Sequence, residues 1–199
     1  FSNQQHGFLL GDPIDGVFTI FHTINGGQNW NRLSTELSPK AATEEHCFAA
    51  SGSVLVSDDA GHLFLATGGS HARVFQSDTA NILSAVGANE ARDDETPVTA
   101  PQSVWIDVSL PIRSGDAAQG IFSVAFRDSK VGIAVGGDYT DPENPLSICA
   151  RTIDGGQTWR AVNANGPSGY RSSVAYIPHS NPPVWVAVGS HGADWSEDD

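Results

Sequence analysis

The chain has 199 residues, of which 23 are acidic and 10 basic, for a net charge of −13. Because such a surface repels phosphate backbones and anionic headgroups, we expect no nucleic-acid partner. No apolar run approaches the roughly 20 residues needed to cross a bilayer, so we expect no direct insertion into a membrane. Hydrophobic residues make up 39%, enough for a packed core, while 21 Gly and 11 Pro favour many short strands joined by turns. The acidic balance suits an extracytoplasmic protein, whether periplasmic, secreted or lumenal.

The N-terminal part of the chain predicts two strands and a glycine-rich turn. An apolar run ending in glycine covers residues 7–11, and a second strand-like run covers residues 17–22. The turn that follows reads Thr23-Ile24-Asn25-Gly26-Gly27-Gln28-Asn29-Trp30 and continues to an aliphatic residue, Leu33. We expect a further short strand after the tryptophan.

The middle of the chain repeats this order around an insertion. We expect a strand of small residues at Phe48-Ala49-Ala50, a glycine-ended strand at residues 62–68 and a third strand at residues 73–78. The ending Trp105-Ile106-Asp107-Val108 matches the tryptophan ending of the first unit. Between them, residues 79–102 are rich in Ala, Asp, Glu, Thr and Pro, and we interpret them as a loop inserted in the turn, with residues 91–97 solvated.

The C-terminal part repeats the pattern twice more. Strands of small residues are predicted at residues 123–126 and 173–176, and glycine-ended strands at residues 132–136 and 184–189. After a strand at residues 147–151 comes the turn Thr152-Ile153-Asp154-Gly155-Gly156-Gln157-Thr158-Trp159, identical to the first turn at six of eight positions and continued to Val162. The next turn would begin at residues 196–199.

Internal repetition of four short strands with a tryptophan turn predicts an all-β fold, a β-propeller of four-stranded antiparallel blades. The blades would cover about residues 1–40, 41–113 (with the inserted loop 79–102), 114–165 and 166–199, the last incomplete. These amount to about three and a half blades of a ring of roughly seven. Since an open propeller leaves unpaired sheet edges, we expect the remaining blades on the same gene product or on a companion chain.

The residues of the turn motif are explained by a role in stabilising the fold rather than by a role in catalysis. A carboxylate or amide oxygen can accept hydrogen bonds from its own turn, glycine permits the backbone angles, and tryptophan buries its ring between sheets. Asn25 stands where the second copy has Asp154, a change that keeps an acceptor but would disable a catalytic carboxylate. The residues assigned to this structural role are Thr23, Asn25, Gly27, Trp30, Trp105, Thr152, Asp154, Gly156 and Trp159.

These turns resemble the Asp-box, or bacterial neuraminidase repeat, of sialidases and of many non-enzymatic propellers. Residues 7–13, 120–127, 135–139 and 169–176 are similar to bacterial relatives of the photosystem II stability/assembly factor. The resemblance covers nearly the whole chain apart from residues 79–102. It implies a propeller of about seven blades that binds a partner protein, as a scaffold, a subunit or an assembly factor of a larger complex, and catalyses no reaction.

A binding site is predicted at the mouth of the channel, where loops into the first strand of a blade meet loops between its second and third strands. Candidate residues from these loops are Asp12, Glu45, His46, His71, Arg73, Gln119, Asp138, Tyr139, Tyr170, Arg171 and His191. No residue is assigned to catalysis and no cofactor is expected. A metal site formed by His46, His71 and His191 is an alternative without diagnostic spacing, so no metal is assigned either.

The principal alternative is a sialidase-like propeller that binds or cleaves glycans. It would need several arginines converging on a carboxylate, and Arg73, Arg127, Arg151 and Arg171 are the candidates. Two cysteines, Cys47 and Cys149, are too few for a disulfide framework or a zinc pattern. We expect two buried thiols, and a single bridge between them remains an alternative.

Overall fold

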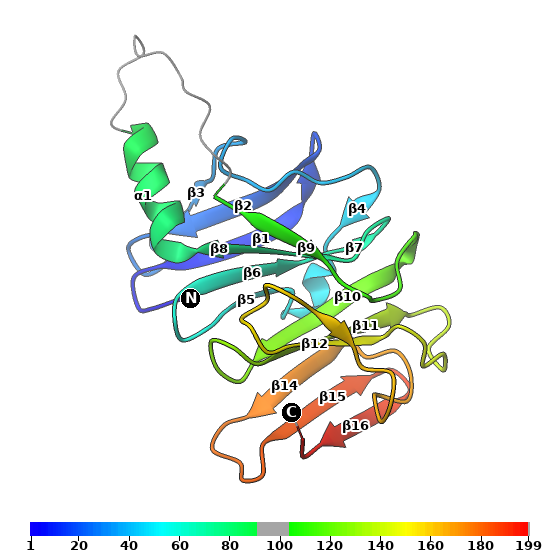
Figure 1. Cartoon of the computed structure of the whole chain (residues 1–199). Coiled ribbons are helices and arrows are strands. Elements are labelled where there is room, and N and C mark those ends of the chain that lie inside the picture. The colour runs from blue at the N-terminus through cyan, green and yellow to red at the C-terminus, as the bar shows by residue number, and fades with distance from the viewer. Residues whose placement is uncertain (91–103, 199) are drawn as a thin grey trace.

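The computed structural model describes residues 1–90 and 104–198. Over these described residues the fold is all-β apart from one α-helix and one short 3-10 helix, and four small antiparallel sheets follow one another from the N-terminus to the C-terminus (Figure 1). This confirms the predicted fold class. Within the described residues, no helix is long and apolar enough to cross a membrane.

The first sheet contains β1 (Gly7–Ile14), β2 (Val17–Thr23) and β3 (Asn31–Arg32) in that order. Phe8 pairs with His22 and Leu10 with Ile20, which places these side chains on one face of the sheet. Phe8 and Ile20 are buried on that face, whereas the Leu9–Phe21 pair lies on the other face and is exposed. Burial therefore alternates from one residue to the next here, as it does in a strand with one face in the core.

The second sheet is four-stranded, with β5 (Leu55–Ser57), β6 (His62–Ala66), β8 (Arg73–Asp78) and β9 (Ile106–Ser109). The strand predicted at residues 48–50 is wrong, because residues 49–51 form a 3-10 helix, η1 (Ala49–Ser51). The first-strand position is taken instead by β5, in which Val56 pairs with Phe64. Phe48 is held away from the sheet by stacking on Phe122, at 3.6 Å between ring centroids.

The third sheet contains β10 (Asp116–Phe126), β11 (Gly132–Asp138), β12 (Cys149–Thr152) and β13 (Arg160–Ala161). It is extended beyond β10 by two short strands, β7 (Gly68–Gly69) and β4 (Glu45–His46). The backbones approach closely where Gly68 meets Gly120, since a Cβ added to Gly120 would lie 2.2 Å from the Gly68 Cα. Gly120 also has a φ of 146°, so both the close approach of the backbones and the backbone conformation require glycine at this position.

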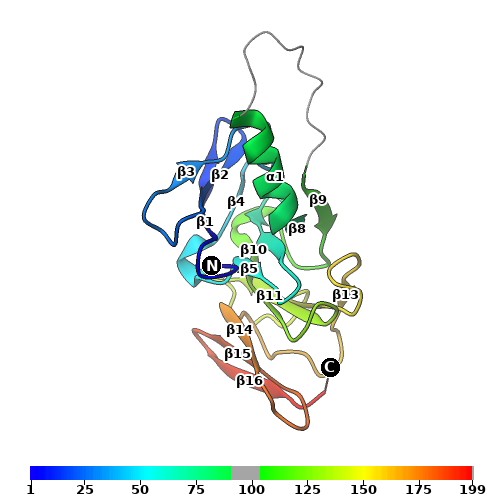
Figure 2. The same cartoon turned by 90° about the vertical axis from the view of Figure 1, so that its left-hand side faces the viewer.

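The fourth sheet contains β14 (Ser173–Ile177), β15 (Val184–Gly189) and β16 (Gly192–Ser196). Val174, Trp185 and Ala187 are buried with Val135, Ile148 and Cys149 of the third sheet in one hydrophobic cluster. A larger cluster joins the first three sheets and includes Phe18, Phe64 and Phe75. Figure 2 shows the sheets in succession, with the first sheet at the upper left and the fourth at the bottom.

Residues 79–90 form a helix, α1 (Thr79–Glu90), so the interpretation of residues 79–102 as a loop throughout is wrong in its first half. Asp78 begins the helix because its carboxylate accepts from the backbone N–H of Ala80 at 2.7 Å and of Asn81 at 3.3 Å. Ile82, fully buried, anchors the helix to the core. The expectation of a solvated segment at residues 91–97 lies outside the described residues.

Two of the three tryptophans of the repeated turns, Trp105 and Trp159, are buried in the cluster that joins the first three sheets, whereas Trp30 is not part of it. Trp105 is 7% exposed, and its indole N–H donates to the backbone carbonyl of Leu37 at 2.9 Å. Trp159 is 8% exposed and makes an edge-to-face contact with Phe126, at 6.1 Å between ring centroids. Trp30 is half-buried beside Phe1.

Candidate functional site

The two repeated turns share the same set of hydrogen bonds, and the second has one more, from the Thr158 hydroxyl to Asp154 Oδ2 at 2.6 Å. In the second, the Thr152 hydroxyl donates to Asp154 Oδ1 at 2.8 Å and accepts from the Gly156 N–H at 2.9 Å, while the Thr158 N–H donates to Asp154 Oδ1 at 2.9 Å. In the first, Thr23, Asn25, Gly27 and Asn29 make the equivalent contacts at 3.0 Å. Because Asn25 and Asp154 accept from their own turns in the same way, turn geometry accounts for both.

Glu45 and Arg73, predicted at the channel mouth, bind each other. The Arg73 Nε donates to Glu45 Oε1 at 2.9 Å, its Nη2 donates to Oε2, and the Thr67 hydroxyl also donates to Oε1 at 2.7 Å. Burial raises the pKa of Glu45, but the hydrogen bonds from Arg73, Ala42 and Thr67 outweigh burial and leave the pKa below its ordinary value. This pair connects β4, which contains Glu45, to β8, which contains Arg73. It leaves neither carboxylate oxygen of Glu45 free for a ligand.

Arg171 is likewise committed within the fold. Its side chain is 1% exposed and forms an ion pair with Asp194, and its Nη1 donates to the Tyr170 carbonyl at 2.7 Å. The Nη2 also donates to the Ser168 hydroxyl at 2.7 Å. Arg171 therefore fixes the loop before β14 against β16.

Gln119 and Asp138 come together at the same end of the third sheet. The Gln119 amide donates to Asp138 Oδ2 at 3.0 Å, and the Thr140 hydroxyl and N–H donate to Oδ1 at 2.6 and 2.9 Å. Burial raises the pKa of Asp138, but these bonds outweigh burial and hold the pKa below its ordinary value. The carboxylate is thus ionised and caps the turn after β11.

The three histidines do not form a common site. His46 Nε2 lies 3.2 Å from the Ala117 carbonyl, whereas His71 and His191 are exposed and each contacts the preceding serine, Ser70 or Ser190. The described part of the chain holds no group of three His, Cys, Asp or Glu side chains arranged for a metal ion. The histidine metal site is therefore not formed by the residues proposed for it.

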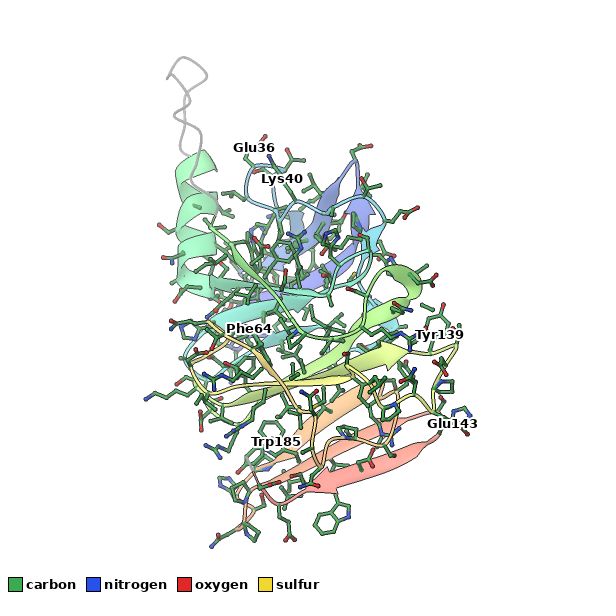
Figure 3. All side chains as sticks on the ribbon, turned by 45° about the vertical axis from the view of Figure 1, so that its right-hand side comes forward. Glu36, Lys40, Phe64, Tyr139, Glu143 and Trp185 are labelled. Atoms are coloured by element: carbon green, nitrogen blue, oxygen red, sulfur yellow. The ribbon has the colours of Figure 1, made fainter. Side chains whose placement is uncertain are left out.

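An aromatic cluster lies beside this end of the third sheet, and only part of it was among the site residues predicted from sequence. Phe122 stacks on Phe48, contacts Tyr170 edge-to-face at 4.8 Å and contacts Tyr139 at 6.1 Å between ring centroids. His46 adds an edge-to-face contact with Phe48 at 5.0 Å. Tyr139 is 50% exposed, and Figure 3 shows it at one end of the sheets, close to Glu143.

The cluster borders a groove of about 570 Å³ to which elements of all four repeats contribute. Its lining is Asp12, Cys47, Phe48, Ala49, Ala50, Ser51, Phe122, Tyr170, Ser172 and Ser173. We call this the aromatic groove. Phe48 and Phe122 were not predicted as site residues, because in the sequence both stand in runs that indicate core strands. The one signal for a site in the sequence was the set of serine and alanine residues next to these two phenylalanines, because small side chains leave room for a ligand beside a ring.

Asp12 and Cys47 meet at the edge of the aromatic groove. The carboxylate Oδ1 of Asp12 accepts from the Cys47 N–H at 3.4 Å and from its thiol at 3.5 Å. Burial, the negative charge of Asp12 and this hydrogen bond raise the pKa of Cys47 to about 12, and burial raises that of Cys149 to about 12. Both cysteines are free and buried, so the bridge is not formed and neither thiol is a nucleophile at neutral pH.

The arginines that a sialidase would need do not converge among the described residues. Arg73 pairs with Glu45 and Asp107, Arg127 with Asp128, and Arg171 with Asp194. Arg151 lines a different groove, between the third and fourth sheets. With no shared carboxylate-binding pocket formed by these four, the geometry gives no support to glycan cleavage.

The fold and the turns together define a class: a set of propeller-like sheets built from repeated Asp-box-type turns. No family model and no curated protein matches the chain. A solved structure, "YCF48 bound to D1 peptide", matches with a TM-score of 0.50 and 14% identity, over 96% of this chain and 45% of that chain. YCF48 from Cyanidioschyzon merolae matches with a TM-score of 0.37 and 14% identity, over 94% of this chain and 62% of that chain.

The first match shows the fold: four small antiparallel sheets that correspond to about half of the YCF48 propeller. The chain thus spans less than two thirds of the length of either solved structure.

Proposed function

We propose that this chain is a non-enzymatic, protein-binding part of a propeller, and that it binds a segment of another protein in the aromatic groove. The observation that carries the proposal is an aromatic cluster beside a groove of about 570 Å³, in which Phe48 stacks on the buried Phe122 and the 50% exposed Tyr139 contacts both rings edge-on. Rigid aromatic side chains bury much area at low cost in conformational entropy, and they dominate binding hot spots. The matched YCF48 structure was solved with a peptide bound, which agrees with this class of partner.

A role as a subunit or assembly factor of a larger complex, in an extracytoplasmic compartment, is the finer form of this proposal. It is supported by an exposed apolar face on the fourth sheet. Ile177, Val188 and Trp195 are 45%, 43% and 69% exposed, and the pairing places them on the face opposite Trp185. Another blade, whether on the same gene product or on a companion chain, could pack against such a face and bury it.

Selection of peptides from a random display library tests the proposed site. Peptides enriched on the 199-residue protein should bind at least about tenfold more weakly to a Tyr139→Ala variant, since loss of a hot-spot ring costs more than 1.4 kcal/mol. Leu146→Ala is the matched control, because Leu146 is 69% exposed and belongs neither to the groove lining nor to the ring cluster in which Tyr139 contacts Phe48 and Phe122. Peptides that bind all three proteins equally would show that the aromatic groove is not the site. Fluorogenic sialosides should remain uncleaved, and measurable turnover would favour the glycan-active alternative.

A further inference from the structure

The aromatic groove has one charged residue among its described lining residues, the carboxylate of Asp12. Asp12 is an exposed residue of β1, and its Oδ1 accepts from the N–H and from the thiol of Cys47. The second oxygen, Oδ2, accepts no hydrogen bond from the described residues. A negative charge therefore lies in the groove wall without a cation to balance it.

A second unpaired carboxylate stands in a loop next to the groove. Glu143 is exposed and forms no hydrogen bond or ion pair with a described residue. It lies in the same loop as Tyr139, after β11, and Figure 3 shows both residues at the right-hand end of the sheets. The carbonyl of Pro142, in this loop, accepts from the N–H of Tyr170, a lining residue of the groove, at 2.9 Å. The loop with Glu143 is thus hydrogen-bonded to the groove wall.

The arginines at this end of the sheets do not neutralise the two carboxylates. Arg113 forms an ion pair with Asp141 at 3.2 Å and lies 3.8 Å from Asp138. Arg73 and Arg171 are each held in an ion pair within the fold. Because the whole chain also has a net charge of −13, the electrostatic potential around the groove is negative. Such a potential attracts cations and repels acidic segments.

The rings of the aromatic cluster suit a cationic side chain. Phe48 stacks on Phe122, and Tyr139 contacts both edge-on, at 6.5 and 6.1 Å between ring centroids. The face of an aromatic ring attracts a cation, and the methylene stem of lysine or arginine packs on the same kind of surface. The fold already contains one such contact, since the Arg73 Cζ lies 4.5 Å from the centroid of the Phe75 ring.

We propose that the segment bound in the aromatic groove carries a lysine or arginine side chain, whose cation binds the Asp12 carboxylate and whose methylene stem packs on Phe48. Flanking residues of the segment contact Tyr139, and Glu143 attracts a second positive charge. The partner is thus a protein with an exposed basic segment. This inference rests on the proposed function, because it specifies the charge of the segment that the groove binds.

The probes are three pools of fluorescein-labelled synthetic peptides, which have a fixed central lysine, norleucine or glutamate and random uncharged residues on either side. Each pool is passed over the immobilised 199-residue protein at low salt. The lysine pool should be retained at least about fivefold more than the norleucine pool, because it adds an ion pair and a cation–π contact to the same apolar stem. The glutamate pool should be retained least. In 1 M salt, where the Debye length is about 3 Å, the lysine excess should be lost.

Asp12→Asn should reduce the lysine excess to less than about twofold and leave retention of the norleucine pool unchanged. Asparagine keeps an Oδ1 acceptor for Cys47, so the variant should fold. Asp59→Asn is the matched control, since it removes the same charge from an exposed position between β5 and β6, outside the groove lining. It should leave the lysine excess unchanged. Glu143→Gln should lower the excess by about twofold. Circular dichroism and urea unfolding confirm that each variant is folded.

Equal retention of the lysine and norleucine pools overturns the inference, and so does an unchanged lysine excess in Asp12→Asn. An excess that Asp59→Asn lowers as much as Asp12→Asn overturns it too, by assigning the effect to the net charge of the chain. If the pools are retained equally but are lost from Tyr139→Ala, the proposed function stands without selectivity for charge. If no pool is retained above the level of Tyr139→Ala, the inference and the proposed function both fail.

Discussion

The hydroxyl oxygens of Ser53 and Ser123 lie 2.7 Å apart at the point where three repeats meet. Ser123, on β10 of the third sheet, is fully buried, and its hydroxyl also accepts from the Val174 N–H of β14 at 2.9 Å. The backbone closes the same junction, since the Val124 N–H donates to the Ser53 carbonyl at 2.9 Å. One serine side chain thus connects the second, third and fourth repeats.

Replacement of that serine should therefore destabilise the fold. In Ser123→Ala the Val174 N–H keeps its buried position and loses its acceptor, a penalty of about 1–3 kcal/mol in the free energy of unfolding. Urea denaturation followed by tryptophan fluorescence measures this free energy. Ser129→Ala, at an exposed position, is the control and should change it by less than about 0.5 kcal/mol. Equal stability of the two variants would mean that the hydroxyl bridge contributes nothing.

The Glu45–Arg73 pair should make stability depend on pH. The folded state lowers the pKa of Glu45 below its ordinary value of 4.5, so its contribution is complete above that pH and is lost as the pH falls through the folded pKa. Glu45→Gln should cost about 3 kcal/mol at pH 7, because it leaves Arg73 in a largely buried place without its main partner. The variant should also lose less stability than the natural chain between pH 5 and about pH 3.

Asp107→Asn is the control for that variant. Asp107 also binds Arg73, at 2.9 Å, but its side chain is 47% exposed, so its loss should cost less than about 1 kcal/mol. Thermal and urea unfolding at several pH values measure both variants. A Glu45→Gln protein with the pH profile of the natural chain would refute the assignment.

Asp154 offers a test of the turn, because the first copy of the motif already contains asparagine. Asp154→Asn keeps the Oδ1 acceptor for the Thr158 N–H but replaces the Oδ2 that accepts from the Thr158 hydroxyl at 2.6 Å, so it should lower the free energy of unfolding by less than about 1 kcal/mol. Asp154→Ala removes the acceptor and should cost about 1–2 kcal/mol, as loss of a helix N-cap does. A comparison of urea midpoints distinguishes the two outcomes. If asparagine were as harmful as alanine, the Oδ1 acceptor would not be the essential feature, and the charged Oδ2 that binds the Thr158 hydroxyl would be.

The turns could be predicted from sequence because their chemistry is local: Thr152, Asp154 and Gly156 form their hydrogen bonds within five residues. The glycine-ended strands could be predicted for the same reason, because each is a short apolar run ending in glycine, as in β1 and β11. The aromatic groove could not be predicted, since Phe48 and Phe122 meet only after β10 joins the short strands β7 and β4. Glu45, Arg73 and Arg171 were assigned to binding because polar loop residues suggest ligands, whereas folding pairs them with one another or with Asp194.

Helix α1 could have been recognised from Asp78 in the N-cap position and from apolar residues at 82, 83 and 86, which share one helical face. The composition of the whole insertion concealed this signal, because Pro and acidic residues further along favour a loop. The strand predicted at residues 48–50 failed for a different reason. The run Val54-Leu55-Val56 competes for the same place in the second sheet and buries more apolar surface there.

The thiols provide the last prediction. Burial raises the pKa of Cys47 and of Cys149 to about 12, in the former with help from the charge of Asp12, so almost no thiolate exists at pH 8 in the folded protein. Iodoacetamide should therefore label the native chain at least about 100-fold more slowly than the chain in concentrated urea, where the ordinary thiol pKa near 8.5 returns. Mass spectrometry of the unreduced, unfolded protein should show two labels. If the unfolded protein took up no label, the two cysteines would be joined by a disulfide bridge. Rapid labelling of the native chain at Cys47 would show that the aromatic groove opens in solution.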